Sequence, residues 1–289
     1  MARKPSYARH DLFPMPMGFP RHGLASGLAY RAQPGDIFVS AYPKCGTTWT
    51  QHIVYLLLHE GRPLGPGQRL TEAFPHLEEV GGADVAARPP PRLIKTHLPC
   101  AVTPHHPRAR YLYIARNPFD CAVSFFHHTR GFPKHYDFAH GTFDDFFECF
   151  IAGEVDFGDY FDNLVPWYAR RHDENVLFLT YEAMKADTRG AVVHIGEFLG
   201  ASAVEHEDVL DAILRHSSFE HMRKHQDRWS SRRPKDMPAF VRRGVVGDWI
   251  NEFSPHQTRR LLDKFVERAR GCDLETIWPE ILAAAREYC

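Results

Sequence analysis

The stretch SAYPKCGTTW, residues 40–49, leads from an apolar run through one glycine, Gly46, into a helical pattern. A turn of this kind points free backbone N–H groups and the positive end of the helix dipole at whatever lies above it. Lys44, Thr47 and Thr48 add an ammonium and two hydroxyls, so the stretch predicts a loop that binds a phosphate or a similar anion. The pattern GxxxxGK[ST], in which the lysine follows the last glycine, is absent, and this disfavours an ATPase or a kinase.

Further basic side chains follow the next apolar runs. Lys95 and His97 end the run RLIKTH, and Arg116 follows the run ARYLYIA. The carboxyl ends of parallel strands meet at one edge of a sheet, so these side chains and Lys44 are expected to lie close together. The sequence therefore predicts a basic crevice beside an imidazole, and an imidazole near neutral pH suits a general base.

The elements that position these residues follow from hydrophobic patterns. Apolar runs alternate with helical patterns, which indicates one α/β domain, residues 1–289, with a central parallel sheet flanked by helices. The predicted strands cover residues 36–41, 92–97, 109–115 and 175–181, and the predicted helices between them and after them cover residues 47–60, 119–128 and 184–199. Further helices are expected at 143–152, 159–172, 255–270 and 279–288, with a long loop at 61–91 and an irregular basic stretch at 226–247.

Composition and charge narrow the possible partners. Of the 289 residues 44% are hydrophobic, and 35 lysines and arginines balance 36 acidic residues to a net charge of −1. A nearly neutral chain has no general attraction to nucleic acid or anionic membranes, so the basic stretch 223–243 is not expected to bind nucleic acid. No apolar run approaches the roughly 18 residues of a membrane span, and the start MARKPSYARHDLF lacks the apolar core of a signal peptide, so we expect a cytoplasmic protein.

Cysteines and histidines show no metal-binding motif. The six cysteines have no CxxC spacing, which predicts free thiols rather than a disulfide framework or a zinc site. His221 and His225 are one helical turn apart, a spacing that can hold a metal, but no third ligand or HExxH pattern accompanies them. We therefore expect no metal.

Several motifs resemble those of the cytosolic sulfotransferases, in that family's order and approximate spacing over nearly the whole chain. They are YPKCGTTW (Tyr42–Trp49), KTHLP (Lys95–Pro99), RNPFDCAVSFFH (Arg116–His127), LTYEAMK (Leu179–Lys185), HSSFEHM (His216–Met222) and FVRRGVVGDW (Phe240–Trp249). The resemblance implies an α/β fold with a P-loop-like loop. It also implies an enzyme that transfers the sulfuryl group of 3′-phosphoadenosine-5′-phosphosulfate (PAPS) to a hydroxyl or amine of a small acceptor. The product is adenosine 3′,5′-bisphosphate (PAP), and no metal is required.

The resemblance further implies which residues bind this nucleotide. The 5′-phosphosulfate would be bound by Lys44, Cys45, Gly46, Thr47 and Thr48. The 3′-phosphate would be bound by Arg116 and Ser124 under a cover of Arg242, Arg243 and Gly244. The adenine would lie against Trp49, Tyr181, Ser217 and Phe219.

The same resemblance assigns catalysis to His97, Lys44 and Lys95. His97 would accept the proton of the acceptor hydroxyl as its oxygen attacks sulfur. Lys44 would stabilise the charge that builds on the bridging oxygen as the bond to sulfur breaks, which explains a lysine set before the turn. Lys95 would steady the transferring sulfuryl oxygens.

The chain departs from the family pattern in the loop and after GDW. Cys45 stands where serine is usual, beside Lys44 and a helix N-terminus, surroundings that make thiols reactive. We hypothesise that its oxidation or alkylation blocks cofactor binding. The dimer signature KxxxTVxxxE would fall on Ile250, Ser254, Pro255 and Arg259, and none matches, so we expect a monomer or a non-standard dimer.

The acceptor pocket also differs. Where the family has proline, an aromatic residue, an apolar residue and glutamate, this chain has Pro75-His76-Leu77-Glu78. A histidine in place of the aromatic side chain predicts a more polar acceptor, such as a catechol or an amine-bearing phenol. The predicted aromatic wall, which would suit a planar ring, consists of Phe19, Phe74, Phe125 and Phe126.

Other functions remain open at this point. An ATP-dependent small-molecule kinase of the P-loop class would need Mg²⁺ and would be indifferent to a 3′-phosphate. A non-catalytic, sulfotransferase-like protein would bind a nucleotide or a hydrophobic ligand without turning it over. The presence of Lys44, Lys95, His97, Arg116 and Ser124 disfavours this second alternative.

Overall fold

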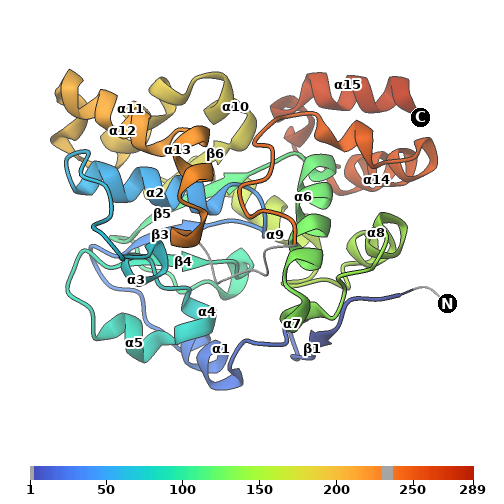
Figure 1. The fold of residues 1–289 in the computed structure, drawn as a ribbon, viewed down its shortest axis with the longest axis horizontal. Helices are drawn as coiled ribbons and strands as arrows, with labels where there is room; N and C mark the ends of the chain where they lie inside the picture. The colour runs from blue at the N-terminus through green and yellow to red at the C-terminus, as the bar shows by residue number, and fades with distance from the viewer. Residues whose placement is uncertain (1–2, 230–236) are drawn as a thin grey trace.

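A parallel sheet of four strands lies at the centre of the computed structural model, which describes residues 3–229 and 237–289 (Figure 1). Its strands are β3 (Ile37–Ser40), β4 (Leu93–Thr96), β5 (Arg110–Ala115) and β6 (Val176–Thr180), in the order β4-β3-β5-β6. Their residues are mostly buried, because both faces of a parallel sheet are covered, and this explains the nearly continuous apolar runs. The predicted strands and the α/β class are confirmed.

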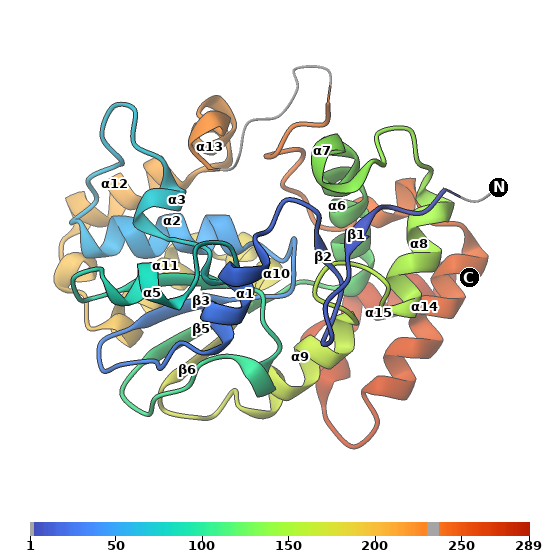
Figure 2. The same cartoon turned by 90° about the horizontal axis from the view of Figure 1, so that it is seen from below.

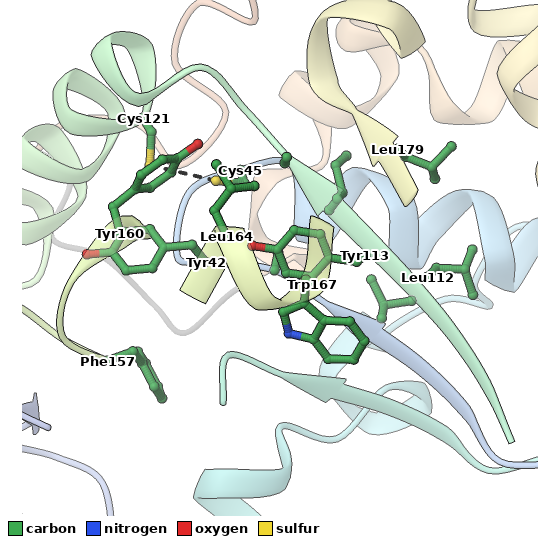
Figure 3. Close-up of a cluster of buried hydrophobic side chains, with 14 of the residues drawn as sticks. Tyr42, Cys45, Leu112, Tyr113, Cys121, Phe157, Tyr160, Leu164, Trp167 and Leu179 are labelled. Carbon is green, nitrogen blue, oxygen red and sulfur yellow. Dashed lines mark hydrogen bonds between the residues drawn. The ribbon is translucent and has the colours of Figure 1, made fainter. Parts of the chain in front are cut away.

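Helices cover the sheet as separate layers. α2 (Thr47–Leu58), α11 (Thr188–Leu199) and α12 (Glu207–Ser217) pack on one another over one face (Figures 1 and 2). On the other face, Trp167 of α9 (Tyr160–Ala169) stacks on Tyr113 of β5, with ring centroids 5.2 Å apart (Figure 3). The sheet is therefore the middle layer, and the residues that follow its strands emerge between the two helical layers.

The helix predicted over 184–199 is in fact two helices. α10 (Tyr181–Ala186) ends at Asp187, whose carboxylate accepts the N–H of Gly190 at 2.8 Å and so caps α11. An aspartate favours this junction because its side chain satisfies N–H groups that lack a partner in the first helical turn. The other long helices predicted from the sequence are present as α2, α6 (Pro118–Gly131), α8 (Phe143–Ala152), α9, α14 (Pro255–Arg268) and α15 (Pro279–Tyr288), although α9 ends before residue 172.

Residues 61–91 contain short helices rather than a simple loop. These are α3 (Leu70–Ala73), α4 (Leu77–Val80) and α5 (Gly82–Ala86), and α4 packs on α1 (Arg21–Leu28). The basic stretch 226–247 begins with the 3₁₀ helix η3 (Gln226–Arg228), and its residues 230–236 lie outside the described residues. The remaining elements are β1 (Tyr7–Ala8), β2 (Met15–Pro16), α7 (Pro133–Tyr136), α13 (Phe219–Lys224), and the 3₁₀ helices η1 (Cys100–Val102), η2 (Ser202–Glu205), η4 (Asp248–Asn251) and η5 (Leu274–Ile277).

The part of the chain that the structure describes, residues 3–229 and 237–289, contains neither a membrane-spanning helix nor a metal-binding cluster. Within these ranges no helix combines the length and the apolar character that crossing a membrane requires. In the same part of the chain, no three His, Cys, Asp or Glu side chains are grouped as ligands for a metal ion, although the rings of His221 and His225 lie 4.7 Å apart. The cysteines are free thiols.

Candidate active site

A cavity of about 300 Å³ lies beside the residues that follow β3, β4 and β5. It brings together most of the predicted site residues from distant parts of the chain. Those that line it are Phe19, Lys44, Gly46, Thr47, Thr48, Trp49, Phe74, His76, Lys95, His97, Arg116, Ser124, Tyr181, Ser217, Phe219, Arg242, Arg243 and Gly244. The crevice expected at the carboxyl edge of the sheet is therefore present.

The loop before α2 has a backbone conformation that few residues adopt. The φ angles of Lys44 and Gly46 are 72° and 109°, in the left-handed region that favours glycine. A Cβ atom on Gly46 would come within 2.9 Å of Ile114 and 3.0 Å of Tyr181, so only glycine fits there. The hydroxyl of Thr47 is buried and has no hydrogen-bond partner among the described residues. The first turn of α2 thus offers backbone N–H groups and an unused hydroxyl to an anion.

Arg116 is fixed in the cavity wall by contacts on several sides. Its guanidinium lies 4.5 Å from the ring centroid of Tyr181, and its Nη2 donates to the carbonyl of Val245 at 3.1 Å. Its backbone carbonyl accepts the hydroxyl of Tyr160 at 2.5 Å. Its Nε is buried and finds no acceptor in the part of the chain that the structure describes. A guanidinium that is held in place with an unused donor is suited to bind a phosphate.

Asp120 joins the RNPFD motif to the GDW motif. Its carboxylate accepts the N–H groups of Gly247 and Trp249 at 2.8 and 3.0 Å. The turn between them contains the buried Asp248, which forms ion pairs with both Arg242 and Arg243. These contacts position two further guanidinium groups at the cavity.

Aromatic rings form another part of the wall. The indole N–H of Trp49 donates to the carbonyl of Ser217 at 3.0 Å, and its ring lies 5.7 Å from that of Tyr181. A Cβ atom on Gly244 would come within 2.4 Å of the ring of Phe219, so glycine lets the chain close against that ring. The hydroxyl of Ser217 is buried, and no described residue forms a hydrogen bond with it. Flat rings beside an unused polar group suit a planar heterocycle.

His97 is oriented by its backbone and by one ring nitrogen. Its Nδ1 lies 2.7 Å from the carbonyl oxygen of Ala41, so Nδ1 carries the proton and donates, and Nε2 holds the free lone pair. The carboxylate of Glu78 accepts the backbone N–H of His97 at 2.6 Å and the hydroxyl of Thr96 at 2.8 Å. Burial, with the positive charge of Lys95 as the next cause, holds the pKa of His97 well below its usual range. The imidazole is therefore neutral at pH 7 and can accept a proton.

The groups around His97 are perturbed as well. Burial raises the pKa of Glu78 to about 7, although its bonds to His97 and Thr96 act in the opposite direction. Burial also lowers the pKa of Lys95. Several shifted pKa values in and directly behind the wall of one cavity are typical of a functional site.

The cavity wall next to His97 is aromatic. The ring of His76 meets that of His97 edge-on, with centroids 5.0 Å apart, and Phe19 meets His76 in the same way at 5.1 Å. Phe157 lies 5.2 Å from His97, and Phe74 lines the same cavity. A planar acceptor ring fits such a wall.

The assignment of Phe125 and Phe126 to this wall is wrong. Phe125 packs against Tyr42 and Phe146 in the core, and Phe126 packs against Phe143 and Phe146. The physical reason is the helical repeat of α6. Its cavity face carries Ser124 and His128, one turn apart, so the residues between them turn away from the cavity.

Cys45 also points away from the cavity, which contradicts the expectation of a reactive thiol at the cofactor. Its side chain is fully buried, with Sγ 3.7 Å from Sγ of Cys121 and 3.9 Å from the carbonyl of Pro43 (Figure 3). Thiols in such surroundings are usually inert, because neither solvent nor reagent reaches them. Cys45 can serve the loop only through its backbone and its small size.

We predict that Cys45 in the folded protein is alkylated by iodoacetamide at least about tenfold more slowly than the partly exposed Cys272 and Cys289. The measurement is peptide mass spectrometry of a labelling time course. A urea-unfolded sample, in which these thiols should react alike, is the control. Rapid labelling of Cys45 that PAP suppresses would contradict the buried orientation and restore the original hypothesis.

Sequence reasoning missed part of the cavity. Lys185 belongs to the LTYEAMK motif, and a basic side chain one helical turn after Tyr181 was the available signal. The part of the cavity beyond His97 includes residues from segments without a recognisable motif. The lining residues not predicted include Pro16, Gln51, Leu70, Thr71, Glu79, His128, Phe132, His135, Tyr136, Asp156, Phe157, Lys185, Met222, Trp229, Phe240, Val241 and Val245.

Comparisons with known proteins agree with this geometry. Residues 34–273 match the family model described as a sulfotransferase domain. Sulfotransferase 1A1 of Bos taurus is 35% identical over 266 residues, with 86% of this chain and 88% of the relative covered. Amine sulfotransferase of Oryctolagus cuniculus is 35% identical over 255 residues, with 84% and 83% covered. Among solved structures, mouse sulfotransferase SULT7A1 in complex with PAP matches with a TM-score of 0.76 at 28% identity, over 98% of each chain.

The fold and the site define an α/β enzyme that transfers a group to a small molecule at the carboxyl edge of a parallel sheet. The chain belongs to the sulfotransferase family, and the reaction class predicted from its motifs is confirmed.

Proposed function

We propose that the protein transfers the sulfuryl group of PAPS to the hydroxyl, or the amine, of a small phenol- or catecholamine-like acceptor. The observation that carries this proposal is a set of buried polar groups in the cavity that the described residues leave without hydrogen bonds, namely Oγ1 of Thr47, Nε of Arg116 and Oγ of Ser217. Burying such groups unpaired costs free energy, so they indicate a polar ligand. A nucleotide with phosphate groups at two positions fits them.

The nucleotide would lie along the cavity with its adenine among the aromatic rings. Trp49, Tyr181 and Phe219 would pack against the base, and Arg116, Ser124 and the Arg242–Gly244 segment would bind the 3′-phosphate. The loop from Lys44 to Thr48 would bind the 5′-phosphosulfate. PAPS supplies a sulfuryl group on a good leaving group. The complex of mouse SULT7A1 with PAP supports this choice of nucleotide.

His97 would act as the general base. Its protonated Nδ1 is engaged by Ala41, which leaves Nε2 to take the proton of the acceptor hydroxyl. A base that stays neutral at pH 7 is ready for this step without first losing a proton. The acceptor oxygen that loses its proton becomes the nucleophile.

The lysines would stabilise the negative charge that develops during transfer. Lys44 lines the cavity from the turn before α2, and its ammonium also lies 4.4 Å from the ring centroid of Phe240. A cation at this position would stabilise negative charge on the departing oxygen. Lys95, on β4 and two residues before His97, would act on the sulfuryl oxygens. The positive charges that stabilise the transferring group come from these lysines, so the proposal includes no metal.

Oligomeric state and location belong to the proposal too. Ser254, at one position of the dimer signature, caps α14 through a reciprocal pair of bonds with Gln257, and Pro255 starts that helix. The signature is thus replaced by a helix start, which supports a monomer or a non-standard dimer.

Resemblance to the cytosolic sulfotransferases supports a cytoplasmic location.

The test is a thermal-shift comparison of PAP, 5′-AMP and ATP with Mg²⁺ at one concentration. A ligand at about a hundred times its Kd adds about 2.7 kcal/mol, which raises the melting temperature by a few degrees in a chain of this size. We expect stabilisation by PAP that clearly exceeds that by the other two ligands. Stabilisation by ATP with Mg²⁺ and not by PAP would favour the kinase alternative. Stabilisation by PAP without turnover of labelled PAPS on any phenol or amine would favour the non-catalytic alternative.

A further inference from the structure

The acceptor side of the cavity contains a buried acid that the reaction described above does not use. Asp156 is 2% exposed and lines the cavity next to Phe157, whose ring contacts His97. One carboxylate oxygen accepts the hydroxyl of Tyr136 at 2.5 Å. The other, Oδ1, is buried and has no hydrogen-bond partner among the described residues. A buried carboxylate with an open oxygen is costly unless something pairs with it.

The turn that carries Asp156 is held firmly against the catalytic loop. The N–H of Phe157 donates to the carbonyl of Pro14 at 2.9 Å. The carbonyl of Gly158 accepts the hydroxyl of Tyr42 at 2.9 Å, and Tyr42 opens the loop that leads to Lys44. Hydrogen bonds of the backbone therefore fix the position of Asp156 relative to His97.

Charge divides the cavity into two parts. The lining lysines and arginines are Lys44, Lys95, Arg116, Lys185, Arg242 and Arg243, and all belong to the motifs that surround the nucleotide or His97. The described lining residues from 16–19, 70–79, 128–136 and 156–157 include no lysine or arginine, and their acidic members are Glu79 and Asp156. The part of the cavity beyond His97 is thus acidic and walled by aromatic rings, which are surroundings that favour a cation.

We propose that Asp156 is the subsite for a protonated amine, so that the acceptor is an amine-bearing phenol whose hydroxyl lies at Nε2 of His97 and whose ammonium lies at Asp156. The inference rests on the sulfuryl transfer proposed above and adds the residue that selects the acceptor. The ammonium pairs with the carboxylate and lies against the rings of Phe157 and Tyr136. The amine itself stays unsulfated, because it is bound as a cation without a lone pair.

The protonation of Asp156 gives the subsite a pH signature. Burial raises the pKa of Asp156 to about 8, so the free carboxylate forms only as the pH rises toward that value. Tyr136 of α7, Tyr7 of β1 and Tyr42 of the loop face it, and burial raises the pKa of Tyr7 and Tyr42 far above this range. Burial lowers the pKa of His135, which lines the same cavity, so its charge is lost at more acidic pH. Binding of an ammonium should therefore strengthen between about pH 6.5 and 8.5, whereas binding of a neutral phenol has no reason to follow Asp156.

The experiment compares tyramine with 4-ethylphenol, which differ by the ammonium alone, in the wild type, in Asp156→Asn and in Glu79→Gln. The asparagine keeps an acceptor for Tyr136 and removes the charge. We expect the ratio of kcat/KM for tyramine to that for 4-ethylphenol to fall at least about tenfold in Asp156→Asn and less than about threefold in Glu79→Gln. The rise of this ratio with pH in the wild type should disappear in Asp156→Asn.

Direct binding separates this inference from the proposed function. The Kd values of both phenols for the PAP-bound protein are measured by calorimetry, and a melting temperature with PAP shows that each variant is folded. If neither phenol is sulfated, the proposed function fails. The ratio of the two Kd values then still shows whether Asp156 binds the ammonium. A ratio that is the same in the wild type and in folded Asp156→Asn overturns the role of Asp156.

Discussion

His97→Ala is expected to lower kcat by about 10²–10⁴-fold, the usual contribution of a positioned general base. The affinity for PAP should change little, because the contacts proposed for the nucleotide come from the loop before α2, from Arg116 and from the aromatic rings. The structural reason is that Nε2 is the only ring nitrogen of His97 left for the acceptor, since Nδ1 donates to Ala41. The measurements are steady-state turnover of labelled PAPS with a phenol and calorimetric titration with PAP.

His59→Ala is the matched control. Nδ1 of His59 also lies 2.7 Å from a backbone carbonyl, that of Tyr55, but His59 is outside the cavity, so turnover should stay near that of the wild type. A normal kcat in His97→Ala would remove His97 from the mechanism. A loss of PAP affinity as large as the loss of kcat would show that His97 supports the nucleotide site instead of transferring a proton.

The pH profile of the wild type offers a second view of the same residue. Burial keeps the pKa of His97 well below 6.5, so the base is neutral throughout the range from about pH 6.5 to 8. For a neutral phenol, kcat/KM should therefore not fall in this range through loss of the base. It should fall only at more acidic pH, where Nε2 takes a proton.

The part of the site proposed for the nucleotide could be predicted from the sequence because its residues are tied to strand ends. Once β3, β4 and β5 are recognised as parallel strands, the residues that follow them must share one edge of the sheet. Lys44, His97 and Arg116 needed no tertiary information beyond that rule. Ser217 and Gly244 came only from the resemblance, because nothing in their local pattern points to a nucleotide.

The part of the site proposed for the acceptor could not be predicted in the same way. Its wall combines Phe19, His76, Tyr136 and Asp156, which come from segments far apart in the sequence and meet only through packing. Asp156 lies in a turn whose pattern resembles any surface turn, and it is its burial in the cavity wall, with Oδ1 unpaired among the described residues, that shows it to be unusual.

Side-chain direction was the other source of error. In the loop before α2, left-handed backbone angles at Lys44 and Gly46 turn the residue between them into the core. No periodic pattern in the sequence indicates that the side chain of Cys45 turns into the core. In α6, by contrast, the helical repeat did contain the information, because a helix that turns Ser124 to the cavity turns Phe125 and Phe126 away from it.

Arg116→Ala is expected to weaken PAP binding by about 100-fold and 5′-AMP binding by less than about threefold. A charge-assisted hydrogen bond to a phosphate contributes about 1.5–3 kcal/mol, and a factor of ten in affinity corresponds to about 1.4 kcal/mol. Arg116 is suited to this because its guanidinium is already placed by Tyr181 and Val245 and still has an unused Nε among the described residues. Only PAP carries the 3′-phosphate, so the loss should be selective. Calorimetric titration with each nucleotide measures it.

The controls decide between a phosphate contact and a structural role. Arg108→Ala removes an exposed arginine just before β5, and should leave the affinities for both nucleotides close to those of the wild type. Arg116→Lys keeps a positive charge but loses the planar guanidinium, so its affinity for PAP should fall between those of the wild type and Arg116→Ala. Equal losses for PAP and 5′-AMP in Arg116→Ala would mean that Arg116 acts by holding Tyr181 and Val245 in the wall. In that case the 3′-phosphate must be bound by Ser124 with Arg242 and Arg243, whose shared partner Asp248 would have to release them.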